Sequence, residues 1–363
     1  MTTIATTGRL LEPHDVGGGG AQEGPGVHHR PTLVHRRHFP GTSVQARLLS
    51  RSVRMTLRPV LSLWARASAL PWPADLIDSV GNLLPPIDGT RCRPAQLPNC
   101  EGLWVEAPDV GSDRVVLYLH GGAFLCCGVR THRRLVSRIS AEAQAPVLMV
   151  DYRMLPAHSI DDAIDDSVDG YRALLAAGWR PEQIVIAGDS AGGYLSFMVP
   201  LRLRDEGLPA PAAVVALSPL TELDPGRKLA HPNADRCALL PVSAAAELFR
   251  LARNIEARKA TDPGAQARMC PVDHDLRGMP RTLIQVGSDE LLLPDAEVMA
   301  ERLAEAGSEC DLQIWEQQLH GFQSAADLLP ESRRAITEIG LFIRHAVPDG
   351  QFDAGRPGDS FDS

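Results

Sequence analysis

The chain has 363 residues, of which 44% are hydrophobic, and it carries a formal net charge of -9 at pH 7. This length fits one large α/β domain with extensions better than two modest domains. The acidic balance argues against nucleic-acid binding as the main role. Seven scattered cysteines without a C-x-x-C motif make no disulfide framework, so a reducing compartment is the simpler interpretation.

The localisation signals are weak. No apolar run reaches the roughly 18 residues that a membrane-spanning helix needs, and the first twenty residues lack the apolar core of a signal peptide. We therefore predict a cytoplasmic protein and leave open an association with a membrane or the cell envelope.

The N-terminal part is unusually basic. Residues 1–42 contain a run of four glycines and two His-Arg clusters, His28-His29-Arg30 and Arg36-Arg37-His38, and are predicted to be a disordered tail. Residues 43–95 are predicted to form a helical cap segment, in which Pro59 should kink or divide a helix. Between Gly24 and Ala74 there is no acidic residue but there are eight arginines: Arg30, Arg36, Arg37, Arg47, Arg51, Arg54, Arg58 and Arg66.

The basic segment has an apolar face at helical spacing between residues 44 and 66. Such a segment fits either a lid over an active site or an element at a membrane surface. We favour the lid, because the apolar pattern continues into Leu70, Trp72 and Leu76, which is typical of packing against a core.

A regular alternation of strands and helices occupies the predicted catalytic domain, residues 96–346. Strands are expected at 103–106, 114–119, 146–151, 183–187, 213–217, 282–286 and 311–316. Helices are expected at about 131–144, 161–177, 191–206, 294–306 and 331–345. Continuous apolar strands between amphipathic helices predict an α/β fold with a mostly parallel sheet, covered by helices on both faces. Residues 221–268, with one helix near 241–256, interrupt the alternation and should add to a helical cap, and residues 347–363 should be a disordered tail.

The sequence Gly188-Asp-Ser190-Ala-Gly192 joins the strand at 183–187 to the helix at 191–206. This is the nucleophile-elbow pattern, in which small residues allow a tight strand-to-helix turn that exposes a reactive serine. A nucleotide-binding turn would instead need G-x-G-x-x-G or a lysine after the turn, and neither is present. We therefore identify Ser190 as the candidate nucleophile.

A serine hydroxyl needs a histidine base and an acid that orients the histidine. His320 follows the last predicted strand, whereas His345 and His274 occupy positions typical of surface or packing residues. Asp289 follows the strand at 282–286 and is our candidate acid. Glu290 is expected to point the other way from the strand end, and Asp295 to lie at the start of a helix.

The oxyanion formed during acyl transfer needs N–H donors aimed at it. The strand at 114–119 is followed by His120-Gly121-Gly122-Ala123-Phe124, a loop whose backbone can turn amides toward the nucleophile. Gly121, Gly122, Ala123 and Ala191 are therefore the candidate oxyanion-hole residues.

Taken in order, these segments resemble the hormone-sensitive lipase family of α/β-hydrolases, which includes bacterial esterases and arylacetamide deacetylases. The matching stretches are LYLHGGAF, VDYRMLPAH, IAGDSAGG, LSPLTEL, LIQVGSDELLLPDA and LHGF. The resemblance implies a nucleophile at Ser190, an acid at Asp289, a base at His320, and oxyanion donors at Gly122, Ala123 and Ala191, with Gly121 shaping the loop. Ala123 stands where the family usually has a third glycine, and the Arg-rich extension resembles actinobacterial lipase/esterase paralogues.

The predicted function is a serine carboxylic-ester hydrolase that acts on short- to medium-chain esters and needs no metal or organic cofactor. One alternative is a lipase or phospholipase that works at a membrane surface through residues 44–66. The other is a ligand-binding protein on a hydrolase fold that has lost its chemistry. The expected partner is a small ester or lipid substrate and not a nucleic acid, and the oligomeric state is left open.

Overall fold

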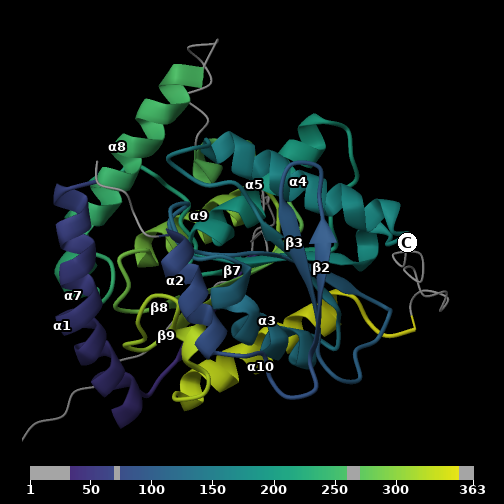
Figure 1. The fold of residues 1–363 in the computed structure, drawn as a ribbon, viewed down its shortest axis with the longest axis horizontal. Coiled ribbons are helices and arrows are strands. Elements are labelled where there is room, and N and C mark those ends of the chain that lie inside the picture. The colour runs from purple at the N-terminus through teal and green to yellow at the C-terminus, as the bar shows by residue number, and fades with distance from the viewer. Residues whose placement is uncertain (1–32, 69–73, 260–269, 351–363) are drawn as a thin grey trace, which may run out of the picture. The chain divides into compact units, whose positions relative to one another are not determined.

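The computed structural model describes residues 33–68, 74–259 and 270–350. Its centre is a nine-stranded sheet with the order β1-β9-β8-β7-β6-β4-β5-β3-β2 (Figure 1). In this sheet order, every strand from β1 through β9, β8, β7, β6 and β4 to β5 is parallel to its neighbour. The last two pairs, β5 with β3 and β3 with β2, are antiparallel. The strands are β1 (Val34–Phe39), β2 (Arg91–Gln96), β3 (Glu101–Glu106), β4 (Val115–Leu119), β5 (Val147–Asp151), β6 (Ile184–Asp189), β7 (Ala213–Leu217), β8 (Arg281–Gly287) and β9 (Cys310–Trp315).

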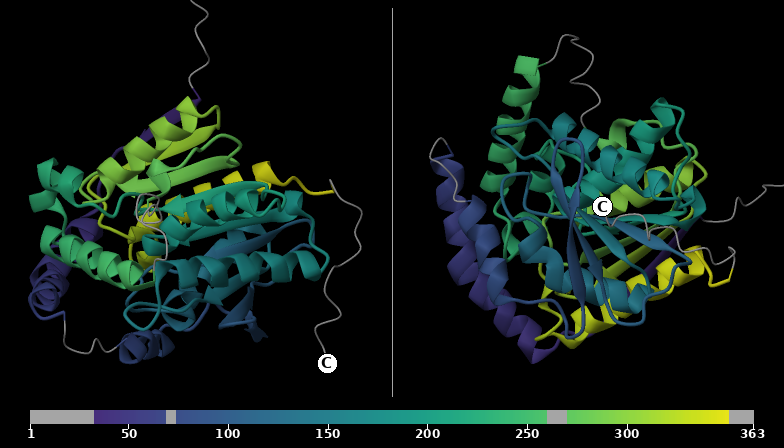
Figure 2. Two further views of the ribbon diagram at one scale, coloured as in Figure 1. Left: turned by 90° about the horizontal axis from the view of Figure 1, so that it is seen from above. Right: turned by 45° about the vertical axis from the view of Figure 1, so that its right-hand side comes forward.

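Helices cover both faces of this sheet, as the sequence predicts (Figure 2). Helices α3 (Val129–Ala143) and α10 (Pro330–Ala346) lie on one face, and α4 (Ile160–Ala176), α5 (Ala191–Asp205) and α9 (Leu293–Glu305) lie on the other. Because side chains alternate along a strand, Val116 and Val185 pack under α3 and α10, while Leu117 and Ile186 pack under α4 and α5. The central strands are therefore apolar on both sides.

The two parts of the chain predicted to form a cap contact each other. Helix α1 (Val44–Arg66) packs against α8 (Val242–Lys259), and the two lie side by side at one edge of the molecule (Figures 1 and 2). Helix α2 (Ala74–Val80) packs on α3. Pro59 lies inside α1 without dividing it. The remaining short elements are η1 (Gly81–Leu83), η2 (Pro181–Gln183), α6 (Gly226–Ala230), α7 (Asn233–Arg236), η4 (Pro271–Asp273) and η5 (Phe322–Ala325).

Two of the strands were not predicted. The prediction of a disordered tail over 1–42 is wrong at Val34–Phe39, which forms β1 and pairs in parallel with β9. Arg91–Gln96, at the predicted boundary between the cap segment 43–95 and the catalytic domain 96–346, forms β2 at the opposite edge. Both are edge strands with mostly exposed side chains, so neither has the apolar run that marks the central strands. Residues 1–32, 260–269 and 351–363, for which we also predicted a tail or a cap, lie outside the described residues.

None of the helices in the described part of the chain has the length and hydropathy needed to cross a membrane.

Candidate active site

Ser190 occupies a sharp turn between β6 and α5, as the motif predicts. Its backbone angles are φ 54° and ψ -113°, a conformation that costs energy for any residue except glycine. Neighbouring groups hold it there, because the Ser190 amide donates to the Leu217 carbonyl at 2.8 Å and the Ser190 carbonyl accepts from the Leu220 amide at 3.1 Å. The turn is also tight, since a Cβ on Gly192 would lie 1.9 Å from the Leu119 carbonyl oxygen.

His320 lies in the loop after β9, within reach of this serine. Its Nε2 is 2.9 Å from Ser190 Oγ, and its Nδ1 is 2.8 Å from Glu290 Oε2. We assign the Nδ1–H tautomer, since a carboxylate can only accept, which leaves Nε2 free to accept the serine proton. A base between a nucleophile and a carboxylate is the arrangement that activates a hydroxyl.

Glu290 is fully buried and is held by three other groups. Its Oε1 accepts from Ser218 Oγ at 2.8 Å and from the Gly287 amide at 2.6 Å. Asn233 Nδ2 donates to the Glu290 carbonyl at 2.8 Å and fixes the backbone. These contacts leave Oε2 for His320.

The prediction that the Asp289 carboxylate contacts His320 is therefore wrong, because Glu290 makes that contact. The Glu290 amide donates to the Gly287 carbonyl at 3.2 Å, so the chain makes a turn directly after β8. Because of this turn, the side chains after β8 no longer alternate in direction as they do along a strand. Glu290 therefore points into the protein, whereas we expected it to point away. Asp289 is only half-buried, and its carboxylate accepts from Ser288 Oγ at 3.2 Å.

The other competing residues lie where the sequence placed them. Asp295 is in the first turn of α9 and is buried against Lys228, at an Nζ–Oδ1 distance of 2.9 Å. His345 lies in the last turn of α10, and His274 follows η4.

The loop after β4 contains the candidate oxyanion donors. Gly122, Ala123 and Phe124 have φ values of 120°, 56° and 57°, so the backbone is left-handed over three consecutive residues. Gly122 could not be replaced easily, because a Cβ there would lie 1.9 Å from the Cys126 carbonyl oxygen. Ala191 begins α5, where the first amides of a helix are available to an anion.

Gly121 differs from the other three candidates. Its amide donates to Asp189 Oδ1 at 3.0 Å, so this N–H serves the protein and not an oxyanion. The inclusion of Gly121 among the predicted oxyanion-hole residues is thus corrected, while its predicted part in shaping the loop is compatible with this contact.

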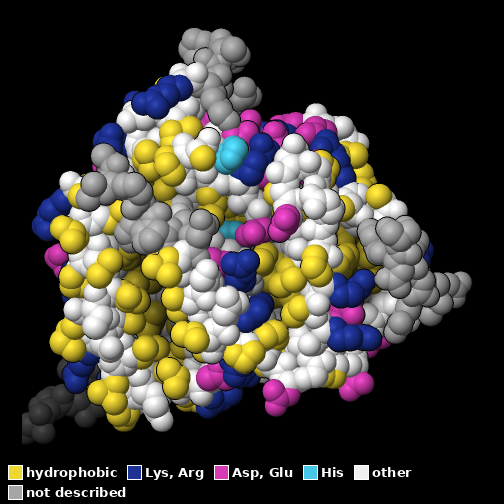
Figure 3. All heavy atoms as spheres, in the orientation of Figure 1, with side chains coloured by type: hydrophobic (Ala, Val, Ile, Leu, Met, Phe, Trp, Pro, Cys, Tyr) yellow, Lys and Arg dark blue, Asp and Glu magenta, His cyan; other side chains and the backbone are white. Residues whose placement is uncertain are grey.

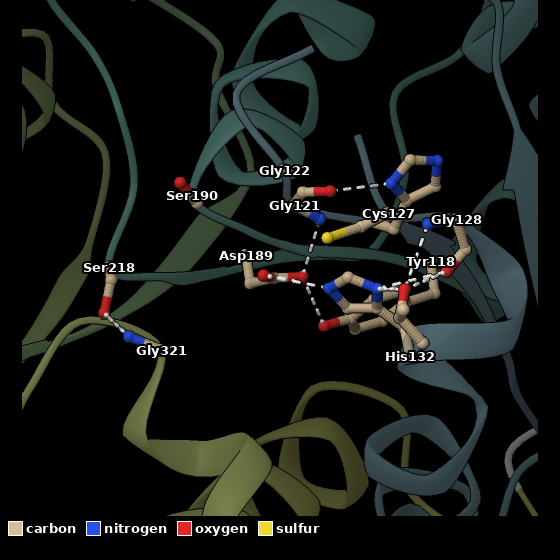
Figure 4. A network of polar contacts seen from close by, with 12 residues as sticks. Tyr118, Gly121, Gly122, Cys127, Gly128, His132, Asp189, Ser190, Ser218 and Gly321 are labelled. Carbon is tan, nitrogen blue, oxygen red and sulfur yellow. Dashed lines mark hydrogen bonds and ion pairs between the residues drawn. The ribbon is translucent and has the colours of Figure 1, made fainter. Parts of the chain in front are cut away.

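Sequence reasoning missed a buried network behind the nucleophile, around Asp189 (Figure 4). Asp189 Oδ1 also accepts from Tyr118 Oη at 2.9 Å, and Oδ2 lies 3.3 Å from His132 Nε2. Burial raises the pKa of Asp189, but the His132 charge and the hydrogen bonds outweigh burial and hold that pKa below its usual value. Burial likewise lowers the pKa of His132, and Asp189 more than reverses the effect.

A second buried imidazole lies beside this pair. His120 stacks on Tyr152 with ring centroids 4.2 Å apart, and its Nδ1–H donates to the Gly121 carbonyl at 2.8 Å. Burial, and next the positive charge on His132, lower the pKa of His120 to about 4. His120 is therefore neutral at pH 7, whereas Asp189 and His132 each shift the other's pKa toward its charged form.

Among the described residues, no group of three or more His, Cys, Asp or Glu side chains is arranged to hold a metal ion. The signals for Ser218 and His132 are not visible in the sequence, because both residues are defined by contacts with distant segments. Glu290 was considered from its place after the strand and was set aside because of its expected direction. Asp189 had one signal, its place inside the elbow motif next to Ser190.

Comparison with known proteins agrees with this fold. Residues 116–324 match a family described as having the alpha/beta hydrolase fold. Esterase LipU of Mycobacterium tuberculosis is 45% identical over 297 residues, which cover 81% of this chain and 100% of LipU. Carboxylesterase/phospholipase LipF of the same organism is 43% identical over 315 residues, 85% of this chain and 84% of LipF.

A solved structure of an esterase from the bacterial hormone-sensitive lipase family has a TM-score of 0.72 and 30% identity, covering 85% of this chain and 100% of that one. The chain therefore belongs to the α/β-hydrolase family, as an ester-hydrolysing enzyme of the hormone-sensitive lipase type.

Proposed function

We propose that the protein is a serine carboxylesterase whose catalytic triad is Ser190, His320 and Glu290. The observation that carries this proposal is the continuous set of contacts from Ser190 Oγ through the His320 ring to Glu290 Oε2, at 2.9 and 2.8 Å. Because all three side chains meet, the non-catalytic alternative has no support from the site.

The reaction follows from these positions. Ser190 Oγ bonds to the ester carbonyl carbon while its proton moves to His320 Nε2. The amides of Gly122, Ala123 and Ala191 stabilise the oxyanion. When the C–O bond breaks, His320 gives its proton to the leaving alcohol. Water, deprotonated by His320, then attacks the acyl-enzyme and releases the acid and free Ser190, so every proton taken is returned.

Glu290 stabilises the imidazolium that forms in each half of the reaction. It lies inside the protein, where a charge interacts more strongly than in water. Its second oxygen is held by Ser218 and Gly287, so the carboxylate cannot rotate away from His320 without losing two hydrogen bonds.

The proposed substrates are short- to medium-chain esters. The support is the cap, in which α1 packs on α8, the Trp64 side chain packs on the core and Ser68 bonds to Glu247. We infer that a cap held together by these contacts limits the length of the acyl chain that can reach Ser190.

The test is the initial rate on p-nitrophenyl esters of two to sixteen carbons, with Ser190→Ala alongside. We expect a maximum at four to eight carbons for the wild type and no turnover by the variant. A maximum with sixteen-carbon esters or triglyceride emulsions contradicts the acyl-length proposal. A folded wild-type protein that is inactive on every ester contradicts the esterase proposal itself.

A second candidate, action at an anionic lipid surface, is favoured by the exterior of the cap. Ten of the thirteen exposed large hydrophobic side chains in the described residues lie in the cap segment: Val44, Leu48, Met55, Leu57, Val60, Leu63, Leu76, Val80, Leu83 and Leu84. Figure 3 shows hydrophobic side chains gathered over α1 and α2. Residues 33–68 contain seven arginines and no acid.

The spacing of these side chains forms a stripe on α1. Val44, Leu48 and Met55 are 59%, 58% and 73% exposed and share one face of the helix, beside the exposed Arg47 and Arg51. Arg54 bonds to the carbonyl of Asp235 in α7, which fixes α1 on the cap. An apolar stripe with arginines along its edge fits the interface of an anionic bilayer.

Vesicle binding tests this candidate. We expect sedimentation with phosphatidylglycerol vesicles that weakens as salt is raised and is lost in Leu48→Glu/Met55→Glu. Leu328→Glu, an equally exposed leucine outside the cap segment, is the matched control and should bind like the wild type. Equal sedimentation of both variants, or none of the wild type, contradicts the candidate.

A further inference from the structure

One buried carboxylate connects the nucleophile to the loop that should hold the oxyanion. Asp189 is the last residue of β6 and directly precedes Ser190. Its carboxylate has partners on three elements: Tyr118 on β4, the Gly121 amide in the following loop, and His132 on α3 (Figure 4). The proposed reaction uses none of these contacts directly.

The contact with Gly121 fixes the start of the loop. The amide lies 3.0 Å from Asp189 Oδ1, and a Cβ on Gly121 would lie only 2.2 Å from Asp189 Oδ2. The loop backbone therefore rests directly on the carboxylate. Gly122 and Ala123 come next, so the direction of their amides depends on where Gly121 is held.

Ser190, which directly follows Asp189 in the chain, is also held in place. Its amide is bonded to Leu217 and its carbonyl to Leu220, so the elbow cannot shift without breaking those bonds. Asp189 thus sets the distance between Ser190 Oγ, which attacks, and the amides that receive the resulting oxyanion. An error of about 1 Å in such a distance can cost about 100-fold in rate.

His132 supports the carboxylate from behind. Its Nε2 faces Asp189 Oδ2, and its Nδ1 lies 3.1 Å from the Gly128 carbonyl and 3.0 Å from Thr131 Oγ1. A cation beside the buried carboxylate compensates its lost hydration and keeps it ionised. An ionised acceptor forms a stronger hydrogen bond with the Gly121 amide than a neutral one does.

We propose that Asp189 is a positioning residue, which holds the Gly121 amide and so aims the amides of Gly122 and Ala123 at the oxyanion formed on Ser190. The His132 ring supports the Asp189 carboxylate at its other oxygen, Oδ2. This inference rests on the proposed esterase function, and it extends that function to a residue that does not touch substrate.

Three variants separate positioning from packing. Asp189→Ala removes the bond to Gly121. Asp189→Asn keeps an oxygen that can accept from Gly121 but removes the charge. Tyr118→Phe is the matched control, because it removes another hydrogen bond to the same Asp189 oxygen and leaves the bond to Gly121.

Two kinetic quantities are measured for each variant with p-nitrophenyl butyrate as substrate. One is the fold-change in kcat, which is compared with the fold-change in KM. The other is the inhibition constant of an aryl trifluoromethyl ketone, which adds a serine to its carbonyl and forms an oxyanion without a leaving group. A variant that only loosens the fold lowers the unfolding temperature without a matching change in the inhibition constant.

The expected pattern is graded. Asp189→Ala should lower kcat on the order of 100-fold with KM changed by less than about threefold, and should raise the inhibition constant by the same factor as the loss in kcat/KM. Asp189→Asn should have a kcat about tenfold higher than that of Asp189→Ala, and therefore about tenfold below that of the wild type. Tyr118→Phe should stay within about threefold of the wild type in both quantities.

Three results would overturn the inference: a folded Asp189→Ala with wild-type kcat, a loss as large in Tyr118→Phe, or an inhibition constant that does not follow kcat/KM. Should Asp189→Ala not fold, Asp189→Asn decides alone, with an expected loss of about tenfold and a matching inhibition constant. The proposed function fails separately, by a wild-type protein that neither turns over esters nor reacts with a fluorophosphonate at Ser190.

Discussion

Glu290 Oε2 lies 2.8 Å from His320 Nδ1, while the adjacent Asp289 faces Ser288. Two neighbouring acids thus have different environments, one fully buried and the other half-buried. A carboxylate that orients a base must lie within hydrogen-bond distance of it, and of these two acids it is Glu290 that meets this requirement.

Glu290→Gln should lower kcat by about 10³- to 10⁴-fold, because the amide cannot stabilise the imidazolium and can offer His320 the wrong hydrogen-bond partner. KM should change little, since Glu290 is fully buried and contacts His320, not the substrate. The measurement is steady-state kinetics on p-nitrophenyl butyrate together with a thermal melt.

Asp289→Asn is the matched control, with an expected kcat within about threefold of the wild type. The reverse result, a large loss in Asp289→Asn and a small one in Glu290→Gln, would return the role of the acid to Asp289.

The choice between these acids shows where sequence reasoning ends. The positions of Ser190 and His320 follow from local patterns, a strand-to-helix turn and a loop after the last strand. The acid also follows its strand as predicted, but its identity depends on the Gly287–Glu290 turn and on the distant Ser218 and Asn233. Strand alternation does not extend into a turn, so it gave the wrong direction for Glu290.

The buried His120 predicts a loss of stability in acid. Its pKa is about 4 in the folded protein and about 6.5 in an unfolded chain. Between these values the unfolded chain binds more protons, so the free energy of unfolding decreases as the pH falls. His120 should account for about 2 kcal/mol between pH 7 and pH 5.

Urea denaturation at both pH values, in wild type and His120→Gln, measures this contribution. The comparison is needed because burial raises the pKa of Asp151 to about 6, which has the opposite effect over part of this range. An equal decrease in wild type and variant would show that other groups cause the acid instability.

Lys228 and Asp295 form a fully buried ion pair that joins α6, in the segment 221–268 predicted as part of a cap, to α9. The Asp295 carboxylate also accepts from the Thr221 and Glu222 amides at 2.9 and 3.0 Å, at the start of that segment. Lys228→Met should lower the free energy of unfolding by about 3 kcal/mol, because a buried carboxylate loses its cation. Arg277→Met is the control, since its pair with Asp275 is at the surface, and it should leave the stability unchanged.

The effect of Lys228→Met should depend on pH. Burial raises the pKa of Asp295, and Lys228 works against this rise. Without Lys228, Asp295 takes up its proton at a higher pH, and protonation relieves the unpaired charge. The destabilisation measured by urea denaturation should therefore be smaller at pH 5 than at pH 8, and a larger effect at pH 5 would contradict this account.

The sheet was predicted well at its centre and poorly at its edges, for a physical reason. Strands β4 to β9 are buried on both faces, so they are continuous apolar runs that stand out in a sequence. Strand β1 has four exposed residues between Val34 and Phe39 and resembles a basic loop. Its strand conformation comes from pairing with β9, a partner about 275 residues away in the chain.

Phe39 provides the test of β1 as part of the folded domain. Its ring stacks on Trp315 with ring centroids 4.0 Å apart. The Arg334 Cζ atom lies over the same Phe39 ring, 4.8 Å from its centroid. Phe39→Ala should lower the free energy of unfolding by about 2–3 kcal/mol, because it opens a cavity against β9 and removes the ring contacts. His38→Ala, at the exposed neighbouring position, should have little effect. Urea denaturation that gives equal values for the two variants would mean that β1 contributes no packing to the stability of the domain.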